Sequence, residues 1–374
     1  MRTLKYVAAV VLASDLLMLS GCGGGGDNNN GSNSSSSNTG TVQCTLLASG
    51  SVFSPGFNDG FIYQIALDAS NVYWYDVNTS NNTGIIKSVS KNGGAVTSLA
   101  SGLGGVHDFA LDDTSIYWTE HVLATGAGSI KSVPKAGGAV VVLASGTPAG
   151  STFDVFGPNG IALDSTFVYW GEAVGGGAVR RVPKAGGTVI DINRGQSGID
   201  TLALDSPTTI IYSSGTVGGG SFFSIPIAGG IPTVLASNVG SNIVAGFIID
   251  STSLFGTDKV NPGRVFSVPL VGGNPTYLAS NLQFPPALAT DGIFLYYSGD
   301  LNNSVNGGPG AIVKMAKTGG AITKGLCVTD LANPSGTVYN ANTLAVDATN
   351  VYLIGYPNGG AGAGQIGILR APKP

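Results

Sequence analysis

The chain is poor in charged residues and in the residues that favour helices. Only 10% of its 374 residues are Asp, Glu, Lys or Arg, and it contains 3 Met and 2 His. Its 59 Gly residues interrupt nearly every stretch that could form a long helix. The net charge is −4 and no run of Lys or Arg occurs, which argues against a nucleic-acid partner. An all-β fold of short strands and turns is the class that remains.

Motifs that would identify common enzyme chemistries are also missing. The sequence has no phosphate-binding glycine loop, no Gly-Xaa-Ser-Xaa-Gly motif and no Cys-Xaa-Xaa-Cys pair. It has no Asp-rich loop with calcium-binding spacing either. We therefore expect no cofactor, no bound metal ion and no catalytic residue set.

What the chain does contain is a repeat: an apolar stretch that ends in Asp, followed a few residues later by an aromatic-rich stretch. Subtracting neighbouring anchor positions gives 44, 52, 41, 45, 41 and 56 residues, a period typical of repeat architectures. We expect these carboxylates to accept backbone N–H groups in a turn rather than to act in catalysis. The anchors are Asp68, Asp112, Asp164, Asp205, Asp250, Asp291 and Asp347.

Each repeat predicts four short strands, with a Gly pair before the last. In the third repeat the first three strands are marked by residues 161–163, 168–170 and 178–183. The Gly pairs can adopt the positive φ that a tight hairpin needs. They fall at 93–94, 137–138, 186–187, 229–230, 272–273 and 319–320. Seven four-stranded antiparallel units predict a single seven-bladed β-propeller domain over residues 42–374.

The two ends of this region complement one another. The seventh repeat has a predicted third strand at residues 365–372 and then ends without a fourth. Residues 44–50, near the start, match the fourth-strand pattern seen at residues 143–146. We therefore expect the N-terminal strand to complete the last blade and close the ring, because an open array would expose two strand edges.

The first 41 residues have the composition of a targeting segment and a linker. Arg2 and Lys5 precede an apolar run that ends near Leu19-Ser20-Gly21-Cys22, which is the layout of a secretory signal. The sequence Leu19-Ser20-Gly21-Cys22 also resembles the bacterial lipobox, whose Cys is acylated. We expect residues 1–21 to be a lipoprotein signal peptide, residues 22–41 a flexible Gly/Asn/Ser tether, and Cys22 the attachment point to membrane lipid. The expected location is the cell envelope, on the periplasmic or outer surface.

Two aromatic stretches resemble known propeller repeats. Tyr117-Trp118-Thr119-Glu120 and Tyr169-Trp170-Gly171-Glu172 are similar to the YWTD repeat of lipoprotein-receptor propellers. The apolar stretch ending in Asp is similar to NHL- and TolB-type repeats. Over residues 42–374 the chain most resembles secreted bacterial propellers of unassigned role, which implies the fold and names no ligand.

One face of the predicted disc collects polar side chains around the mouth of the central channel. They lie at the start of a first strand or the end of a second, and these ends share a face because the strands are antiparallel. The opposite face receives Lys91, Lys135, Lys184 and Lys317 beside the Gly pairs, so the two faces should differ in charge. The candidate ligand-binding residues at the mouth are Tyr63, His107, Asp108, Glu120, His121, Asn159, Asp200 and Asn342.

The only two histidines, His107 and His121, leave two interpretations open. Placed in neighbouring blades with Asp108 and Glu120 nearby, they could supply a general base or hold a metal ion. Resemblance to seven-bladed lyases of the virginiamycin type implies the same possibility. The other interpretation is that both are solvated surface residues.

Two cysteines, Cys44 and Cys327, remain after Cys22. In an oxidising compartment an even pair predicts a disulfide. This one would tie the closing strand to the sixth repeat.

These features favour a monomeric, membrane-anchored extracytoplasmic propeller that binds an envelope protein or a small ligand without chemistry. The alternative is a lyase- or lactonase-type enzyme with a His/carboxylate or metal site at the channel mouth.

Overall fold

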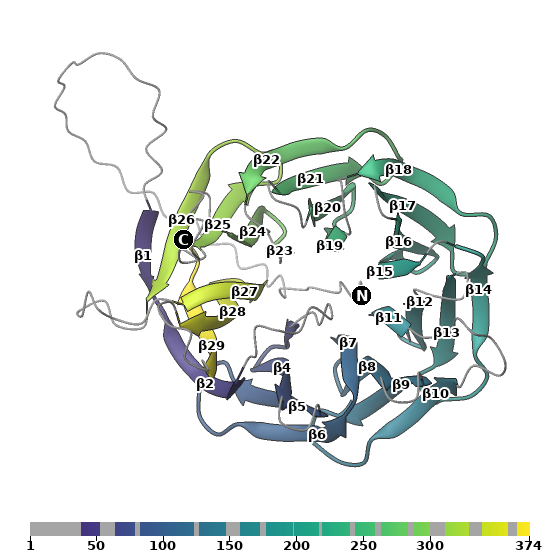
Figure 1. The fold of residues 1–374 in the computed structure, drawn as a ribbon, viewed down its shortest axis with the longest axis horizontal. Coiled ribbons are helices and arrows are strands. Elements are labelled where there is room, and N and C mark those ends of the chain that lie inside the picture. Colours follow the sequence, from purple (N-terminus) through teal and green to yellow (C-terminus); the bar gives the residue numbers. More distant parts are fainter. Residues whose placement is uncertain are drawn as a thin grey trace, which may run out of the picture.

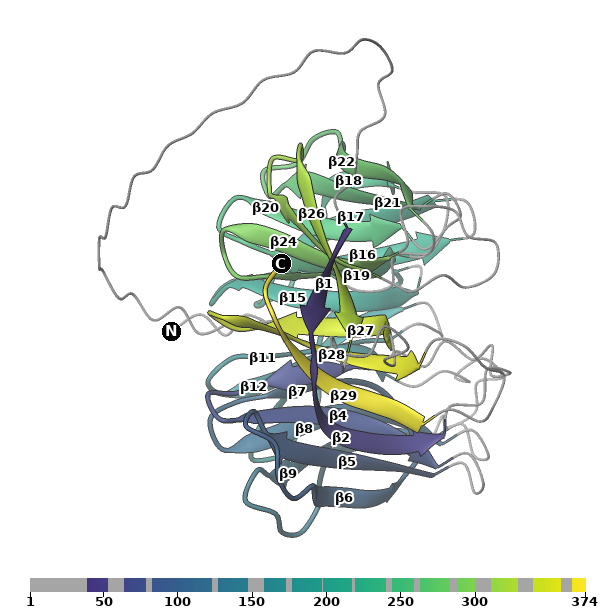
Figure 2. The same cartoon turned by 90° about the vertical axis from the view of Figure 1, so that its left-hand side faces the viewer.

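The computed structural model describes residues 39–52, 64–78, 83–122, 127–146, 158–172, 177–196, 198–216, 219–239, 244–258, 263–282, 288–299, 311–328, 339–357 and 365–374. In these ranges every regular element is a β-strand, and the strands form seven sheets around a common axis (Figure 1). Figure 2 shows the resulting disc edge-on. The predicted seven-bladed propeller is confirmed. None of these ranges contains a helix long and apolar enough to cross a membrane.

Blades one to five each consist of four consecutive antiparallel strands, with the first at the centre and the fourth at the rim (Figure 1). The strands of blades one and two are β3 (Ile65–Leu67), β4 (Asn71–Asn78), β5 (Thr83–Ser90), β6 (Thr97–Leu103), β7 (Gly105–Leu111), β8 (Ser115–Val122), β9 (Ala127–Pro134) and β10 (Val141–Gly146). Those of blades three to five are β11 (Pro158–Leu163), β12 (Phe167–Glu172), β13 (Ala178–Pro183), β14 (Ile190–Arg194), β15 (Ile199–Ser206), β16 (Thr209–Thr216), β17 (Gly219–Pro226), β18 (Thr233–Val239), β19 (Val244–Ile249), β20 (Ser253–Asp258), β21 (Gly263–Pro269) and β22 (Thr276–Leu282).

The seventh blade joins the two ends of the domain. It contains β27 (Tyr339–Val346), β28 (Asn350–Pro357), β29 (Gln365–Pro372) and, at the rim, β2 (Thr45–Val52). β2 pairs antiparallel with β29, with Thr45 opposite Arg370 and Ala48 opposite Ile368. The predicted closure of the ring by an N-terminal strand is therefore confirmed.

The sixth blade has a fifth strand that the repeat pattern does not predict. Its regular strands are β23 (Leu288–Thr290), β24 (Phe294–Gly299), β25 (Ala311–Ala316) and β26 (Ile322–Val328), and β1 (Thr39–Gln43) adds to the outer edge of β26. This pairing is parallel, from Thr39 opposite Lys324 to Gln43 opposite Val328. Residues 39–41 of the expected tether therefore belong to a strand. Their Thr-Gly-Thr sequence lacks the alternation of apolar residues that would predict a strand. The strand forms because the open edge of β26 offers backbone hydrogen-bond partners to any extended segment.

The residue after β1 fixes this arrangement covalently. Cys44 and Cys327 are joined by a disulfide with an S–S distance of 2.05 Å and a Cα–Cα distance of 5.5 Å, across 283 residues of sequence. Cys327 lies in β26, so the bond links the strand entering blade seven to the rim of blade six. Both cysteines are buried, with 2% and 0% of their surface exposed.

The hydrophobic core is divided among the seven interfaces between blades. Each buried cluster takes residues from two neighbouring blades, including one in which Trp74 packs with Tyr352 and Ile354 where the seventh blade meets the first. Successive strand residues point to opposite faces of a sheet, so each blade contributes side chains to the two clusters on either side of it. The six Gly pairs adopt φ between 79° and 146°, which confirms their predicted role in the hairpins.

We predict that replacing both Cys44 and Cys327 by Ser lowers the free energy of unfolding by about 2–4 kcal/mol, because the crosslink restricts the unfolded chain. Denaturant titration of the variant and of the parent protein measures this difference. The parent protein under reducing conditions should match the variant. An unchanged midpoint after reduction would contradict the prediction.

Candidate functional site

The repeated Asp residues organise the turns between the first two strands of a blade. In blade two, Asp112 Oδ1 accepts the backbone N–H of Thr114 and of Ser115, each at 2.9 Å. Asp112 Oδ2 accepts the hydroxyl of Tyr117 at 3.1 Å and the ammonium of Lys184, from blade three, at 2.7 Å. One carboxylate therefore closes a turn, holds an aromatic side chain and joins two blades.

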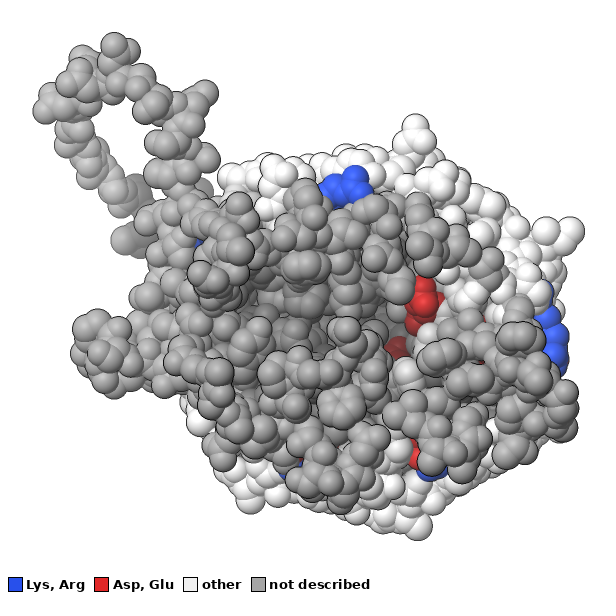
Figure 3. All heavy atoms as spheres, viewed as in Figure 1, with Lys and Arg blue, Asp and Glu red and all other residues white. Residues whose placement is uncertain are grey.

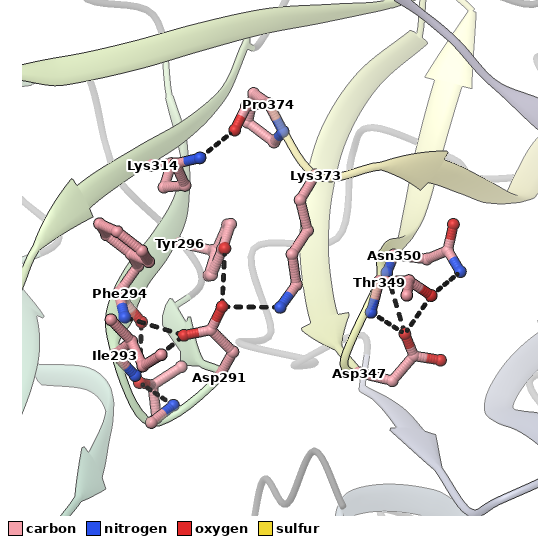
Figure 4. A network of polar contacts seen from close by, with 12 residues as sticks. Asp291, Ile293, Phe294, Tyr296, Lys314, Asp347, Thr349, Asn350, Lys373 and Pro374 are labelled. Atoms are coloured by element: carbon pink, nitrogen blue, oxygen red, sulfur yellow. Dashed lines mark hydrogen bonds and ion pairs between the residues drawn. The ribbon is translucent and has the colours of Figure 1, made fainter. Parts of the chain in front are cut away.

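This interblade bond recurs at five of the seven interfaces. Each lysine ammonium contacts the Asp of the preceding blade and lies 5.2–5.6 Å from the centre of an aromatic ring, which adds a cation–π attraction. Figure 4 shows the bond from Lys373 to Asp291, with Tyr296 on the same carboxylate oxygen. The pairs are Lys91–Asp347, Lys135–Asp68, Lys184–Asp112, Lys317–Asp250 and Lys373–Asp291. Four of these lysines were predicted on this face, but their partners were not.

The expected turn role is confirmed for six anchors, and the turn that follows the seventh, Asp205, is built differently. A turn of this kind needs an N–H two residues after the Asp, and Pro207 has none. The turn moves forward by one residue, and Ser206 Oγ accepts the N–H of Thr208 at 3.3 Å. Asp205 instead becomes part of β15.

The ion pairs shift the titration of the Asp residues. Burial raises the pKa of Asp112, but the hydrogen bonds from Lys184 and from backbone N–H groups outweigh burial and hold that pKa at about 2. The pKa of Asp291 is also about 2, for the same reasons, with Lys373 as the cation. Since these values lie below the ordinary pKa of 3.8, ionisation of the two carboxyls favours the folded state. Lowered pKa values also occur at Asp68, Asp250 and Asp347.

We predict that acid weakens the protein through these carboxyls. The stabilisation is complete above the unfolded pKa near 4 and is lost as the pH falls through about 2; after solvent screening it is about 1–2 kcal/mol for Asp112. Lys184→Met should lower the free energy of unfolding at pH 7 and reduce its fall between pH 5 and pH 2. The control is Arg194→Met, which removes an exposed ion pair with Asp191. Equal unfolding curves for the two variants would contradict the prediction.

Two of the predicted channel-mouth carboxylates have structural partners. Glu120, 2% exposed, accepts hydrogen bonds from Lys131 Nζ at 2.7 Å and from Trp118 Nε1 at 3.0 Å. Asp108, 5% exposed, accepts the backbone N–H of Ile161 in the next blade at 2.8 Å. These contacts place both carboxylates inside the blade packing rather than on an open surface.

The Glu120 arrangement belongs to a second recurring feature. In blades one to three, the acid two residues after the Trp of the second strand pairs with a basic residue on the third strand. The register explains this, because the base lies directly opposite the Trp. The pairs are Asp76–Lys87, Glu120–Lys131 and Glu172–Arg180. The acid follows the Trp by two residues in all three blades, a recurrence that could have identified the acids from sequence.

The two histidines lie in one blade, so their expected placement in neighbouring blades is wrong. His107 is in β7 and His121 in the adjacent β8, where His121 pairs with Gly105. The side chain of His107 is half-buried. Among the residues whose side chains the structure describes, no group of three or more His, Cys, Asp or Glu is arranged to hold a metal ion. Tyr63, Cys22 and the side chains of His121 and Asn342 lie outside the described part of the chain.

Asn159 contacts the strand that carries Asp200, where blades three and four join. Asn159 Nδ2 donates to the carbonyl of Ile199, the residue before Asp200, at 3.4 Å, and both side chains are half-buried. The innermost strands approach closely because Gly160 has no side chain: a Cβ there would lie 2.8 Å from Thr201 Cα. On the face shown in Figure 3, acidic side chains lie towards the middle of the disc and the most prominent basic ones at its rim.

Burial raises the pKa of Asp200 to about 6. A folded pKa above the ordinary value of 3.8 means that the folded state prefers the neutral carboxyl, so stability falls as the pH rises from about 4 to about 6 and stays at the lower level above pH 6. We predict that Asp200→Asn increases the melting temperature at pH 8 and leaves it nearly unchanged at pH 4. Thermal unfolding at the two pH values measures this difference. An equal effect at both would show that the carboxyl is not desolvated.

No family model matches the chain, and no curated protein matches it either. Among solved structures it is similar to a variant of puromycin hydrolase, with a TM-score of 0.60 and 12% identity over 85% of this chain and 53% of that one. It is also similar to the WD40 β-propeller domain of Doa1, with a TM-score of 0.53 and 10% identity over 87% and 96% of the two chains. A third similar structure is a prolyl endopeptidase, with a TM-score of 0.55 and 9% identity over 88% of this chain and 51% of that one.

These similarities show the β-propeller fold alone. The chain spans about half the length of the puromycin hydrolase and of the prolyl endopeptidase.

Proposed function

We propose that this chain is an extracytoplasmic β-propeller, anchored to lipid through Cys22, that acts as a binding scaffold without catalysing a reaction. The disulfide between Cys44 and Cys327 is the observation that supports an extracytoplasmic location. Structural disulfides persist in oxidising compartments and are rare in the reducing cytosol. A buried disulfide that follows an N-terminal secretion pattern therefore supports export.

The binding role is supported by the contacts and the exposure of the polar side chains at the predicted channel mouth. Asp108 and Glu120 are the carboxylates that a histidine-based reaction would recruit, and both have structural partners: Asp108 accepts the N–H of Ile161 in the next blade, and Glu120 pairs with Lys131 in its own blade. His107, Asn159 and Asp200 remain half-exposed on the same face. Amide, imidazole and carboxyl groups on rigid strands suit recognition of a polar ligand or a protein loop.

Acylation is the first test. The full chain, produced in a bacterial host, should yield an N-terminal peptide that begins at Cys22 and carries the added mass of acyl chains, and it should partition into the membrane fraction. Cys22→Ser should remove both properties while leaving the melting temperature unchanged, since residue 22 lies 17 positions before the first described strand (39 minus 22). An unmodified N-terminus on the secreted chain would refute the anchor.

Binding at the mouth is the second test. A photo-reactive side chain at Asn159 should crosslink one discrete partner in envelope extracts or a retained small molecule, whereas the same group at Val142, on the rim, should not. The enzymatic alternative predicts substrate turnover that is lost in a His107→Ala/His121→Ala variant. Such turnover would contradict the scaffold role.

A further inference from the structure

Blade four lacks the acid–base pair that occurs in each of blades one to three. In those blades an acid at the end of the second strand pairs with a basic residue on the third strand, as Glu172 does with Arg180. In blade four the position of the acid is taken by Gly215. The position of the base is taken by Phe222, which lies opposite Ser213. Blade four therefore has no ion pair of this type.

A carboxylate is nevertheless present beside Gly215, supplied by Asp200 on the innermost strand. A Cβ at Gly215 would lie 3.2 Å from Asp200 Oδ2, so the absence of a side chain there leaves room for the carboxylate. Asp200 lies where the register of β15 shifts between Ile199 and Thr201. Bulges of this kind redirect a side chain and are frequent beside functional sites. The acid is thus retained in blade four, on a different strand and without the base.

The carboxylate of Asp200 has no partner in the part of the chain that the structure describes. No hydrogen bond or ion pair reaches it, and burial alone raises its pKa to about 6. The sequence around it offers no cation, because residues 195–258 contain Asp at four positions and no Lys, Arg or His. A carboxylate that is withdrawn from water without a partner costs free energy, which a cationic ligand would restore.

The neighbouring blade contributes a second hydrogen-bond acceptor. Asn159 Nδ2 donates to the carbonyl of Ile199, the residue before Asp200, so the amide oxygen of Asn159 is the atom left for a ligand. A carboxylate and an amide oxygen both accept hydrogen bonds. A ligand that satisfies both must donate hydrogen bonds and carry a positive charge.

We propose that Asp200 binds the ammonium group of a ligand at the channel mouth, with the amide oxygen of Asn159 as a further acceptor. The inference rests on the proposed binding role and goes beyond it by naming the chemical class of the ligand. An ammonium group has three donors and supplies the positive charge that blade four lacks.

A metal ion fits these residues less well. Calcium takes about six to eight oxygen ligands, several of them carboxylate oxygens. Among the residues whose side chains the structure describes, no three His, Cys, Asp or Glu are grouped to hold a metal ion.

The charge of Asp200 should control this binding. On β15 itself, Asp205 lies towards the other end of the strand. The strands packed against β15 are β11, β12, β16 and β19, and their titratable side chains are Glu172, which has Arg180 as its counter-ion, and Tyr212, whose hydroxyl donates to Gln196 Oε1 at 3.0 Å. Protonation of Asp200 below pH 6 therefore removes the charge that attracts an ammonium group.

The test measures binding of small primary alkylamines, each paired with the alcohol of the same carbon skeleton. Ligand-observed NMR titrations use the full chain with Cys22→Ser, which removes the proposed acylation site. The same titrations are made after adding Asp200→Asn. The matched control is Asp113→Asn, which removes an exposed carboxylate in the turn after Asp112. Melting temperatures show that each variant is folded.

We expect the amines to bind at pH 7.5 and the matched alcohols not to bind. Asp200→Asn should weaken amine binding by at least about tenfold, as expected for loss of a hydrogen bond to a charged group, whereas Asp113→Asn should leave it unchanged. Amine affinity should fall as the pH is lowered from 7 to 5, and this fall should be absent in Asp200→Asn. Equal binding of amines and alcohols, or equal affinity of the parent and Asp200→Asn, would overturn the inference.

Crosslinking from Asn159 separates this inference from the proposed function. A partner captured there by a chain that binds no amine would overturn the ammonium site and leave the binding role intact. Neither capture nor amine binding would overturn both. A captured protein whose crosslink is reduced by excess amine would assign the ammonium group to a lysine side chain, and a retained small amine would assign it to a free ligand; either result supports the inference.

Discussion

The structure depends on the pairing of β2 with β29. Each blade buries its two faces against its neighbours, so no blade has a complete environment until the ring is closed. The closing sheet joins the first and last strands of the repeat region, and it brings the cluster around Trp74 together with residues from more than 250 positions later. Without this pairing, β29 would present an open edge and two blade faces would be exposed to water.

Three further contacts reinforce the closure at the same place. The disulfide ties Cys44 to blade six, β1 adds to the edge of β26, and Lys373 bridges to Asp291. Lys314 also donates a hydrogen bond to the carbonyl of Pro374 (Figure 4). Bonds of the Lys–Asp type recur around the ring, whereas the disulfide and the added strand are confined to the junction of blades six and seven. The closure is thus held by covalent, backbone and ionic contacts together.

The fold could be predicted from sequence because its signals are local and repeated. The Asp anchors, the Gly pairs and the missing last strand each follow from short motifs, and the structure agrees with them. The failures come from contacts between repeats. The pairing of Lys184 with Asp112 joins residues 72 positions apart, and nothing in either segment alone indicates it. Pro207 shows the opposite case: its missing N–H displaces the turn at Asp205, and this could have been deduced from sequence.

The candidate site was harder to predict, because a strand end does not determine where a side chain points. Glu120 and Asp108 lie at the expected positions along their strands, yet their carboxylates are directed into the blade packing. The strands that carry Asn159 and Asp200 lie close together because Gly160 has no side chain, a three-dimensional effect that a repeat pattern does not encode. Comparison of the repeats does show that the lysine of these pairs is replaced by Ile227 in blade four and by Leu270 in blade five.

Amide hydrogen exchange tests the closure most directly. If β2 and β29 form the outer half of a closed blade, amides of residues 45–52 and 365–372 should exchange as slowly as those of the corresponding strands β10 and β9 in blade two, and they should open together in the same cooperative step. Rapid exchange of residues 45–52 while β9 and β10 remain protected would contradict a ring closed by the N-terminal strand.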